Sequence, residues 1–151
     1  LHSFPTRRSS DLFYKINNDS IPLGLVCELV QKAHCSSYQV LCQVPSQQVA
    51  DSLDSLLWTH DPASFIPHGV GSKNIPVAIS TDPFPGDHYQ LLINLCHEIP
   101  EWFSRFERII EIVNSNKSYQ DSKRENFQFY KDRGYPLGFY DLTKRTAHNK
   151  S

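Results

Sequence analysis

The heptapeptide Tyr-Gln-Leu-Leu-Ile-Asn-Leu at residues 89–95 is the most informative part of this sequence. Its apolar residues follow one another almost without interruption over a length typical of a β-strand. Such a run indicates a strand that is covered on both faces of a sheet. We therefore predict that residues 89–95 form a central strand. Residues 109–113, Ile-Ile-Glu-Ile-Val, have the same character and predict a second buried strand.

Helices and shorter strands alternate on both sides of these two runs. Apolar residues at helical spacing predict helices over residues 22–34, 46–58 and 117–133, the last capped by Asn116 or Ser118. A short helix is predicted from Pro100, and further strands over residues 13–16, 38–44 and 75–80. Prolines and glycines predict an irregular segment over residues 59–74. The alternation predicts an α/β sandwich around a mainly parallel sheet.

The length of 151 residues is that of a single domain. No apolar run approaches the ~20 residues that a membrane-spanning helix needs, which excludes the transmembrane class. The four cysteines are scattered along the chain, and no secretory segment precedes them. We therefore expect reduced thiols and a cytoplasmic location.

The first twelve residues, LHSFPTRRSSDL, differ from the rest because they have no apolar periodicity. They resemble a translated sequencing adapter, and the chain contains no methionine, so we expect residues 1–12 to be a non-native leader and the natural start to be missing. We expect one domain over residues 13–142 and a flexible tail over residues 143–151.

Charge is divided unevenly along the chain. Residues 13–116 carry 5 basic and 11 acidic side chains, a net charge of −6. Residues 117–151 carry 8 basic and 4 acidic side chains, a net charge of +4. An acidic body with a basic C-terminal quarter indicates either a localised surface that attracts anions or a solvated basic helix and tail.

The motifs of nucleotide, metal and covalent chemistry are missing from the sequence. Residues 69–73, Gly-Val-Gly-Ser-Lys, lack the spacing of a phosphate-binding P-loop. The cysteines lack the paired spacing of a zinc site and are expected to be small buried hydrophobic residues. Carboxylate pairs such as Glu107 with Glu111 are expected to be solvated. We therefore predict no catalytic, metal-binding or cofactor-binding residues.

The last predicted helix has one face that combines cations with an aromatic ring. At 100° per residue, one arc of about 80° holds Lys117, Gln120, Arg124, Phe127 and Lys131. An apolar pocket rimmed by cations suits an acidic peptide that ends in an apolar residue, because a guanidinium can pair with the terminal carboxylate. The alternative is that Phe127 packs inward while the cations are solvated.

A second candidate surface follows the second predicted helix. The segment LWTHDPASFIPHG places Trp58, Phe65, Ile66 and Pro67 in irregular chain. Aromatic residues in such loops either anchor a protein interface or cover the core beneath the loop. The sequence pattern leaves both possibilities open.

These segments resemble a known family from Phe13 to about Leu142. The matching stretches are LDSLLWTHDPASFIPHGV at 53–70, PVAIS at 76–80, LLINL at 91–95, RIIEIV at 108–113 and RENFQFYKDRGY at 124–135. The sequence is similar to the chi subunit family of the bacterial DNA polymerase III holoenzyme. The resemblance implies a single-domain, three-layer, Rossmann-like α/β sandwich without nucleotide chemistry. It also implies an accessory replication subunit without catalysis of its own.

The resemblance implies two protein partners, with DNA contacted only indirectly and no membrane involved. One partner is the psi subunit, which tethers chi to the clamp loader and would contact Trp58 and Phe65. The other is the acidic C-terminal tail of single-stranded DNA-binding protein, which would contact the surface of Val113, Arg124, Phe127 and Gly134. The implied location is the bacterial cytoplasm, at the nucleoid-associated replisome.

The sequence departs from the family pattern on the last helix. Gln120 and Gln128 occupy positions where the family has lysines, and Phe127 replaces a tyrosine. We expect neighbouring lysines to replace the lost charge: Lys117, Lys123 and Lys131.

Three alternative functions remain. The same fold could bind a repair helicase through the Phe65 patch instead of psi. A direct single-stranded nucleic-acid binder would need aromatic platforms within a basic groove, which the acidic body does not favour. A small enzyme would need a constellation of reactive side chains that the sequence does not display.

Overall fold

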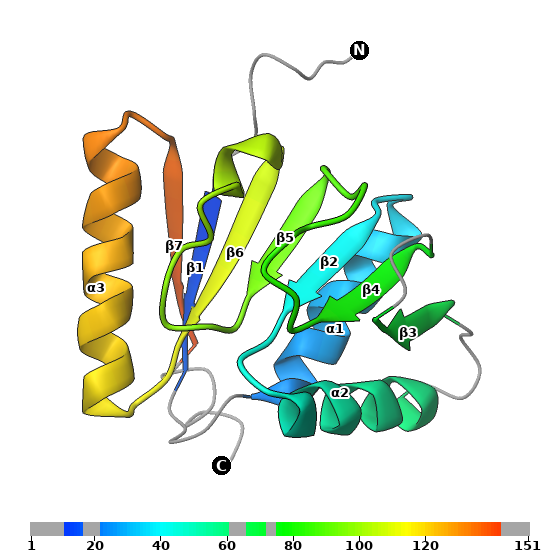
Figure 1. Cartoon of the computed structure of the whole chain (residues 1–151). Coiled ribbons are helices and arrows are strands. Elements are labelled where there is room, and N and C mark those ends of the chain that lie inside the picture. Colours follow the sequence, from blue (N-terminus) through cyan, green and yellow to red (C-terminus); the bar gives the residue numbers. More distant parts are fainter. Residues whose placement is uncertain (1–10, 17–21, 61–65, 72–74, 143–151) are drawn as a thin grey trace.

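The chain forms a parallel β-sheet covered on both faces. The computed structural model describes residues 11–16, 22–60, 66–71 and 75–142. The strands in this part of the chain are β1 (Asp11–Lys15), β2 (Val40–Gln43), β3 (His68–Val70), β4 (Val77–Ser80), β5 (Leu91–Asn94), β6 (Arg108–Val113) and β7 (Leu137–Asp141). They lie in the order β3-β4-β2-β5-β6-β1-β7, and every neighbouring pair is parallel (Figure 1).

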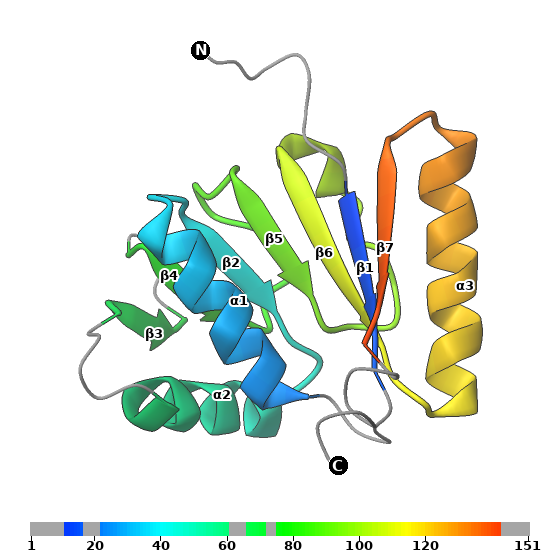
Figure 2. The ribbon, with the colours of Figure 1, turned by 180° about the vertical axis from the view of Figure 1, so that it is seen from behind.

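Helices lie on the two faces of this sheet and give the molecule three layers. They are α1 (Leu23–Cys35), α2 (Gln47–His60), the short 3₁₀-helix η1 (Phe103–Arg105) and α3 (Lys117–Asp132). Helices α1 and α2 share one hydrophobic core with one face of the sheet. Helix α3 and η1 share a second core with the opposite face, as the two opposed views show (Figures 1 and 2). The predicted α/β class with a mainly parallel sheet is confirmed.

Strand β5 occupies the middle of the sheet, as the apolar run at residues 89–95 predicts. Its side chains alternate between the two cores, because successive residues of a strand point to opposite faces. Leu91 and Ile93 pack in the core under α1 and α2. Leu92 packs in the core under α3. Both faces are therefore covered, which explains the uninterrupted hydrophobic sequence.

Local side-chain chemistry sets the ends of α3. The Asn116 side chain accepts a hydrogen bond from the backbone N–H of Tyr119 at 3.1 Å, so Asn116 is the N-cap. At the other end, Gly134 has a φ of 81°, a conformation that glycine adopts without strain. The N–H groups of Gly134 and Tyr135 donate to the carbonyls of Lys131 and Tyr130. This pair of bonds is a Schellman motif, which turns the chain back toward β7.

The structure differs from the sequence predictions at both edges of the sheet. Strand β3 lies within the segment 59–74 that was predicted to be irregular, and no strand was predicted where β7 forms. Strand β1 begins at Asp11, two residues before the predicted start at Phe13, and both added residues are buried. Residues 1–10 and the predicted tail, residues 143–151, lie outside the described residues.

Candidate functional site

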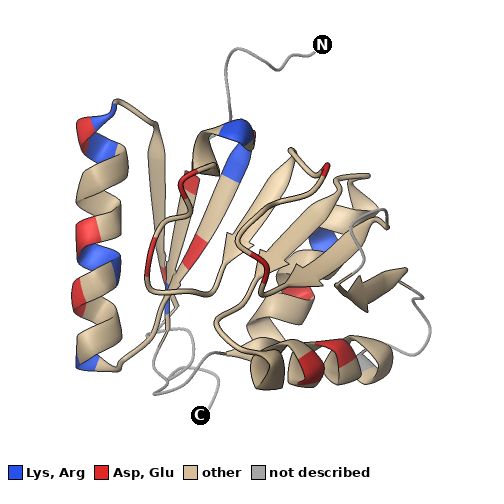
Figure 3. Ribbon diagram, in the orientation of Figure 1, with Lys and Arg blue, Asp and Glu red and all other residues tan. Residues whose placement is uncertain are grey.

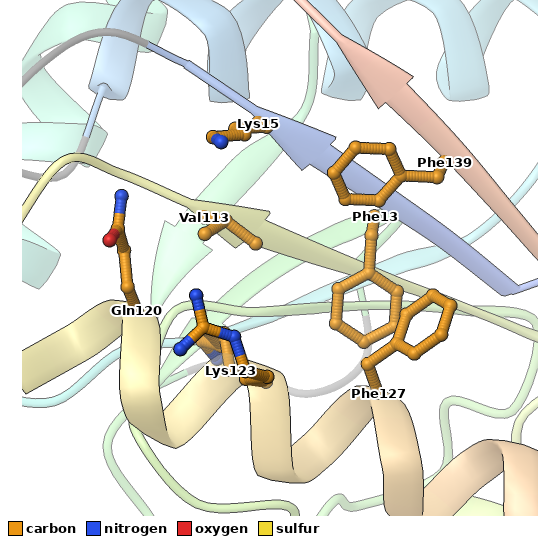
Figure 4. A pocket seen from close by; sticks show the side chains of 8 residues that line it. Phe13, Lys15, Val113, Gln120, Lys123, Phe127 and Phe139 are labelled. Atoms are coloured by element: carbon orange, nitrogen blue, oxygen red, sulfur yellow. The ribbon is translucent and has the colours of Figure 1, made fainter. Parts of the chain in front are cut away.

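A pocket opens between α3 and the strands β1, β6 and β7 (Figure 4). Its volume is about 270 Å³, close to the lower end of the roughly 300–1,000 Å³ typical of ligand pockets. Its lining residues are Phe13, Lys15, Val113, Gln120, Lys123, Arg124, Phe127 and Phe139. The structure thus brings four predicted tail-binding residues together: Val113, Gln120, Arg124 and Phe127.

The strand register explains why residues far apart in sequence meet here. Phe13 and Lys15 are two residues apart on β1, so both side chains point to the face that α3 covers. Lys15 pairs in register with Val113 on β6. Phe13 pairs in register with Phe139 on β7. The floor of the pocket therefore consists of an aromatic row followed by a row that contains a cation.

One end of the pocket is aromatic. The ring centroid of Phe127 lies 5.1 Å from that of Phe13 and 6.4 Å from that of Phe139, in edge-to-face geometry. Phe13 is buried, whereas Phe139 is 53% exposed. Phe127 therefore packs inward on Phe13, as the alternative interpretation of the helix face required, and also presents its ring to the pocket.

The opposite end of the pocket carries positive charge. Arg124 is largely exposed, and its Nη1 lies 3.3 Å from Oδ1 of Asp121 one turn earlier on α3. Exposed pairs of this kind contribute little to stability, so the guanidinium can exchange this partner for a ligand carboxylate at low cost. Figure 3 shows basic residues interspersed with acidic ones along α3, whereas the charged residues drawn on α2 are acidic. The pocket thus lies against the more basic of these two helices.

Lys123 does not provide the exposed replacement charge expected from the sequence. Its side chain has no exposed surface, and Nζ donates hydrogen bonds to the Glu111 carboxylate and to the backbone carbonyl of Cys96. Lys123 forms part of the pocket wall, but Glu111 neutralises the charge of its ammonium group. The expectation for Lys123 is therefore wrong.

Glu111 is also buried, which corrects the expectation that it is solvated. Its second carboxylate oxygen accepts hydrogen bonds from the Tyr130 hydroxyl at 2.8 Å and from Nδ2 of Asn94 at 3.1 Å. Together with Lys123, these contacts connect α3 to the neighbouring strands β5 and β6. We call the set Glu111, Lys123, Tyr130 and Asn94 the buried polar cluster. The sequence indicates this cluster through one acidic residue, Glu111, inside an apolar strand. A buried carboxylate of this kind requires a charged or hydrogen-bonding partner.

Other predicted residues of the last helix lie outside this pocket. Lys117 and Lys131 are exposed on α3 and are absent from the pocket lining. Gly134 is likewise absent from the lining and caps the helix instead. Sequence reasoning missed three residues of the pocket: Phe13, Lys15 and Phe139. Strand register, and not helical periodicity, brings them to α3.

The second candidate surface is only partly exposed. Trp58 is 52% exposed at the end of α2, and its ring lies 4.5 Å from that of His68 on β3. Ile66 is buried in the core under α1 and α2, so it supports the fold and offers little contact area. Pro67 is half-buried, and Phe65 lies outside the described residues. Trp58 is therefore the main exposed hydrophobic group of this predicted surface in the described part of the chain.

Burial makes three of the four thiols harder to ionise, whereas Cys35 is exposed. Burial raises the pKa of Cys27 to about 11, that of Cys42 to about 12 and that of Cys96 to about 11.

The described residues contain no group of three or more histidine, cysteine or acidic side chains placed to hold a metal ion. Nor does any helix in the described ranges have the length and apolar character needed to cross a membrane.

Comparison with known proteins identifies the family of this chain. The family model described as "DNA polymerase III chi subunit, HolC" matches residues 10–138. The DNA polymerase III subunit chi of Pseudomonas aeruginosa is 34% identical over 127 residues, which cover 83% of this chain and 89% of that protein. The chi subunits of Haemophilus influenzae and Escherichia coli are 29% and 26% identical, over 75% and 83% of this chain and 82% and 92% of those proteins. The chain therefore belongs to the DNA polymerase III chi subunit family, whose members are accessory subunits in DNA replication.

Proposed function

We propose that this chain is an adaptor that connects the clamp loader to single-stranded DNA-binding protein. In this proposal the pocket beside α3 binds the acidic C-terminal tail of single-stranded DNA-binding protein, and the Trp58 surface binds the psi subunit. The adaptor works in the bacterial cytoplasm, contacts DNA only through its partner and catalyses no reaction. The observation that carries the proposal is a pocket with aromatic rings at one end and the exposed Arg124 and half-buried Lys15 away from them.

The chemistry of the pocket suits an acidic peptide with an apolar C-terminal residue. Rings of Phe127 and Phe139 would cover the last side chain, and the Arg124 guanidinium would pair with the terminal carboxylate. Arg124 follows Gln120 by one turn and precedes Phe127 by one turn, so all three face the same groove. The volume of about 270 Å³ suits one or two side chains and not a large ligand.

A weak contact is sufficient for this role. A micromolar dissociation constant corresponds to about −8 kcal/mol. Many tails along one coated strand raise the effective concentration without adding contacts. The adaptor therefore holds the polymerase near its template while any single tail remains free to dissociate.

The test is titration of a fluorescent peptide ending in Asp-Asp-Ile-Pro-Phe, followed by anisotropy at two salt concentrations. We expect saturable, salt-sensitive binding that Arg124→Ala weakens about tenfold, because a charge-assisted hydrogen bond contributes roughly 1.5–3 kcal/mol. The matched control is Arg105→Ala, an exposed arginine of η1 outside the pocket, which should bind as the unaltered chain does. Absence of binding by the folded, unaltered chain would refute the tail-binding part.

The Trp58 part of the proposal has a separate test. We expect Trp58→Ala to weaken binding to psi in a titration of the two purified proteins, because exposed aromatic residues are frequent anchors of interfaces. Binding to a repair helicase instead of psi would support the alternative partner. Binding of bare single-stranded oligonucleotide without single-stranded DNA-binding protein would favour direct nucleic-acid recognition.

A further inference from the structure

Lys15 lies at the carboxyl end of β1, on the side of the pocket opposite α3. Its register neighbours are Val113 on β6 and Asp141 on β7. Figure 4 shows Lys15 on β1 and Gln120 on α3, both near Val113 and with side chains away from the three phenylalanine rings. The Lys15 side chain is half-buried and lines the pocket. Lysines in such a setting commonly pack the alkyl stem and keep the ammonium group accessible.

Of the three cations that line the pocket, Lys15 and Arg124 are available to a ligand. Lys123 is neutralised by Glu111 and has no exposed surface. Arg124 makes an exposed contact with Asp121, its one ion pair within the described ranges. The positive charge of this pocket therefore comes from two opposed walls, one on α3 and one on β1.

Phe139 forms the outer wall of the aromatic end. It belongs to β7, the edge strand, and its ring faces that of Phe127 at 6.4 Å. Because it is 53% exposed, it has apolar surface left to cover. Phe13 lies in register beside it and forms the floor. An apolar side chain that enters here would contact rings from two strands and one helix.

We propose that Lys15 and Phe139 determine the direction and selectivity of peptide binding in this pocket, an inference that rests on the proposed function. The C-terminal aromatic side chain lies between Phe127 and Phe139, and its carboxylate pairs with Arg124. The preceding residues run toward the carboxyl end of β1, because Lys15 lies two residues, about 6–7 Å, beyond Phe13 along the strand. Lys15 there pairs with an acidic side chain of the peptide.

Asp141 provides an internal check on this assignment. It is the register neighbour of Lys15 on β7, and its side chain is exposed. A carboxylate beside Lys15 lowers the local positive potential that a peptide carboxylate meets. Asp141→Asn should therefore strengthen binding of the acidic peptide, in the direction opposite to a change at Lys15.

The experiment compares three labelled peptides by anisotropy: Asp-Asp-Ile-Pro-Phe, Asn-Asn-Ile-Pro-Phe and Asp-Asp-Ile-Pro-Ala. Lys15→Gln should weaken the first peptide about three- to fivefold and leave the second unchanged, as expected for loss of one partly exposed ion pair. Phe139→Ala should weaken the first about fivefold or more and leave the third nearly unchanged, since loss of the ring removes an aromatic contact to the last side chain of the peptide. Asp141→Asn should strengthen the first about twofold at low salt.

Matched controls separate local from general effects. Lys32→Gln changes an exposed lysine of α1, on the opposite face of the sheet, and Phe84→Ala changes an exposed phenylalanine outside the pocket. Neither should alter the affinity for any peptide. Thermal unfolding of each variant checks that the fold is intact.

The outcomes separate this inference from the proposed function. If Arg124→Ala weakens binding while Lys15→Gln and Phe139→Ala do not, the tail site stands and the roles of Lys15 and Phe139 are wrong. Equal weakening of acidic and amide peptides by Lys15→Gln would also overturn the role of its charge. If the unaltered chain binds none of the three peptides, the proposed function itself fails.

Discussion

The two faces of the sheet are built from different side chains. The buried residues of the core under α1 and α2 are aliphatic residues and cysteines, for example Val26, Leu53 and Ile93. The core under α3 is rich in aromatic rings, including Phe13, Phe106 and Tyr130. It also borders the buried polar cluster.

The candidate site lies on the aromatic face, beside α3. Both cores exclude water by close packing of their side chains. Aromatic rings prefer edge-to-face or offset contacts, with ring centroids about 4.5–7 Å apart. The polar cluster, in turn, needs directional partners. The proposed function therefore assigns binding to the face that combines aromatic rings with a buried polar cluster, and no binding to the aliphatic face.

The largest effect should come from breaking the buried polar cluster. Lys123→Ala leaves the buried Glu111 carboxylate without its cation, and the free energy of unfolding should fall by about 3–5 kcal/mol. Urea denaturation measures this loss. Replacing both partners, with Glu111→Leu and Lys123→Met, should restore much of it, because no charge then remains buried.

The matched control is the exposed ion pair on the same helix. Asp121→Asn removes the partner of Arg124 and should change stability by less than about 1 kcal/mol. If Lys123→Ala and Asp121→Asn gave equally small losses, the buried polar cluster would not hold α3 on the sheet.

A smaller effect is expected from a cavity on the aliphatic face. Leu53 of α2 is fully buried, and Leu53→Ala should lower the free energy of unfolding by about 3 kcal/mol. Affinity for the acidic peptide should stay unchanged, because α2 and the pocket lie on opposite faces. Leu56→Ala, at a half-buried position of the same helix, should cost less. A loss of peptide affinity in folded Leu53→Ala protein would contradict the division between the two faces.

The smallest effect concerns pH. The pKa of Cys42 is raised from 9.0 to about 12 by burial, so the folded thiol stays neutral while the unfolded thiol ionises. Stability from this group is therefore complete below pH 9 and is lost as the pH rises from 9 toward 12. Between pH 8 and 10 the free energy of unfolding of the unaltered chain should fall by on the order of 1 kcal/mol more than that of its Cys42→Ala variant. Denaturant titration at the two pH values measures the difference. The control variant Cys35→Ala, which changes an exposed thiol, should show the same fall in the free energy of unfolding as the unaltered chain.

The sequence predicts the inner part of the sheet better than its edges. Strands β5 and β6 have continuous apolar runs because both of their faces are covered. The edge strands β3 and β7 include glycines and remain partly exposed, so they lack that signal. Only the pairing of β7 with β1 identifies it as a strand.

The candidate site was predictable to the extent that it lies on one helix. Helical periodicity places Gln120, Arg124 and Phe127 together, and the pocket contains all three. The same periodicity places Lys123 with Tyr119 and Tyr130 on the buried face, a pattern that would have shown its charge to be unavailable. Lys15 and Phe139 needed the strand order, which no local pattern contains.

The position of β1 between β6 and β7 has a consequence for folding. The first strand of the described chain pairs only with the last two strands, and one contact, from Asp11 to Ile109, spans 98 residues. Contacts between such distant segments require costly loop closure and slow the search for the native topology. We expect β2, β4 and β5 to pair early, and β1 to join the sheet only after β6 and β7 have formed. The pocket that depends on β1 should thus be among the last regions to form, after much of the scaffold that supports it.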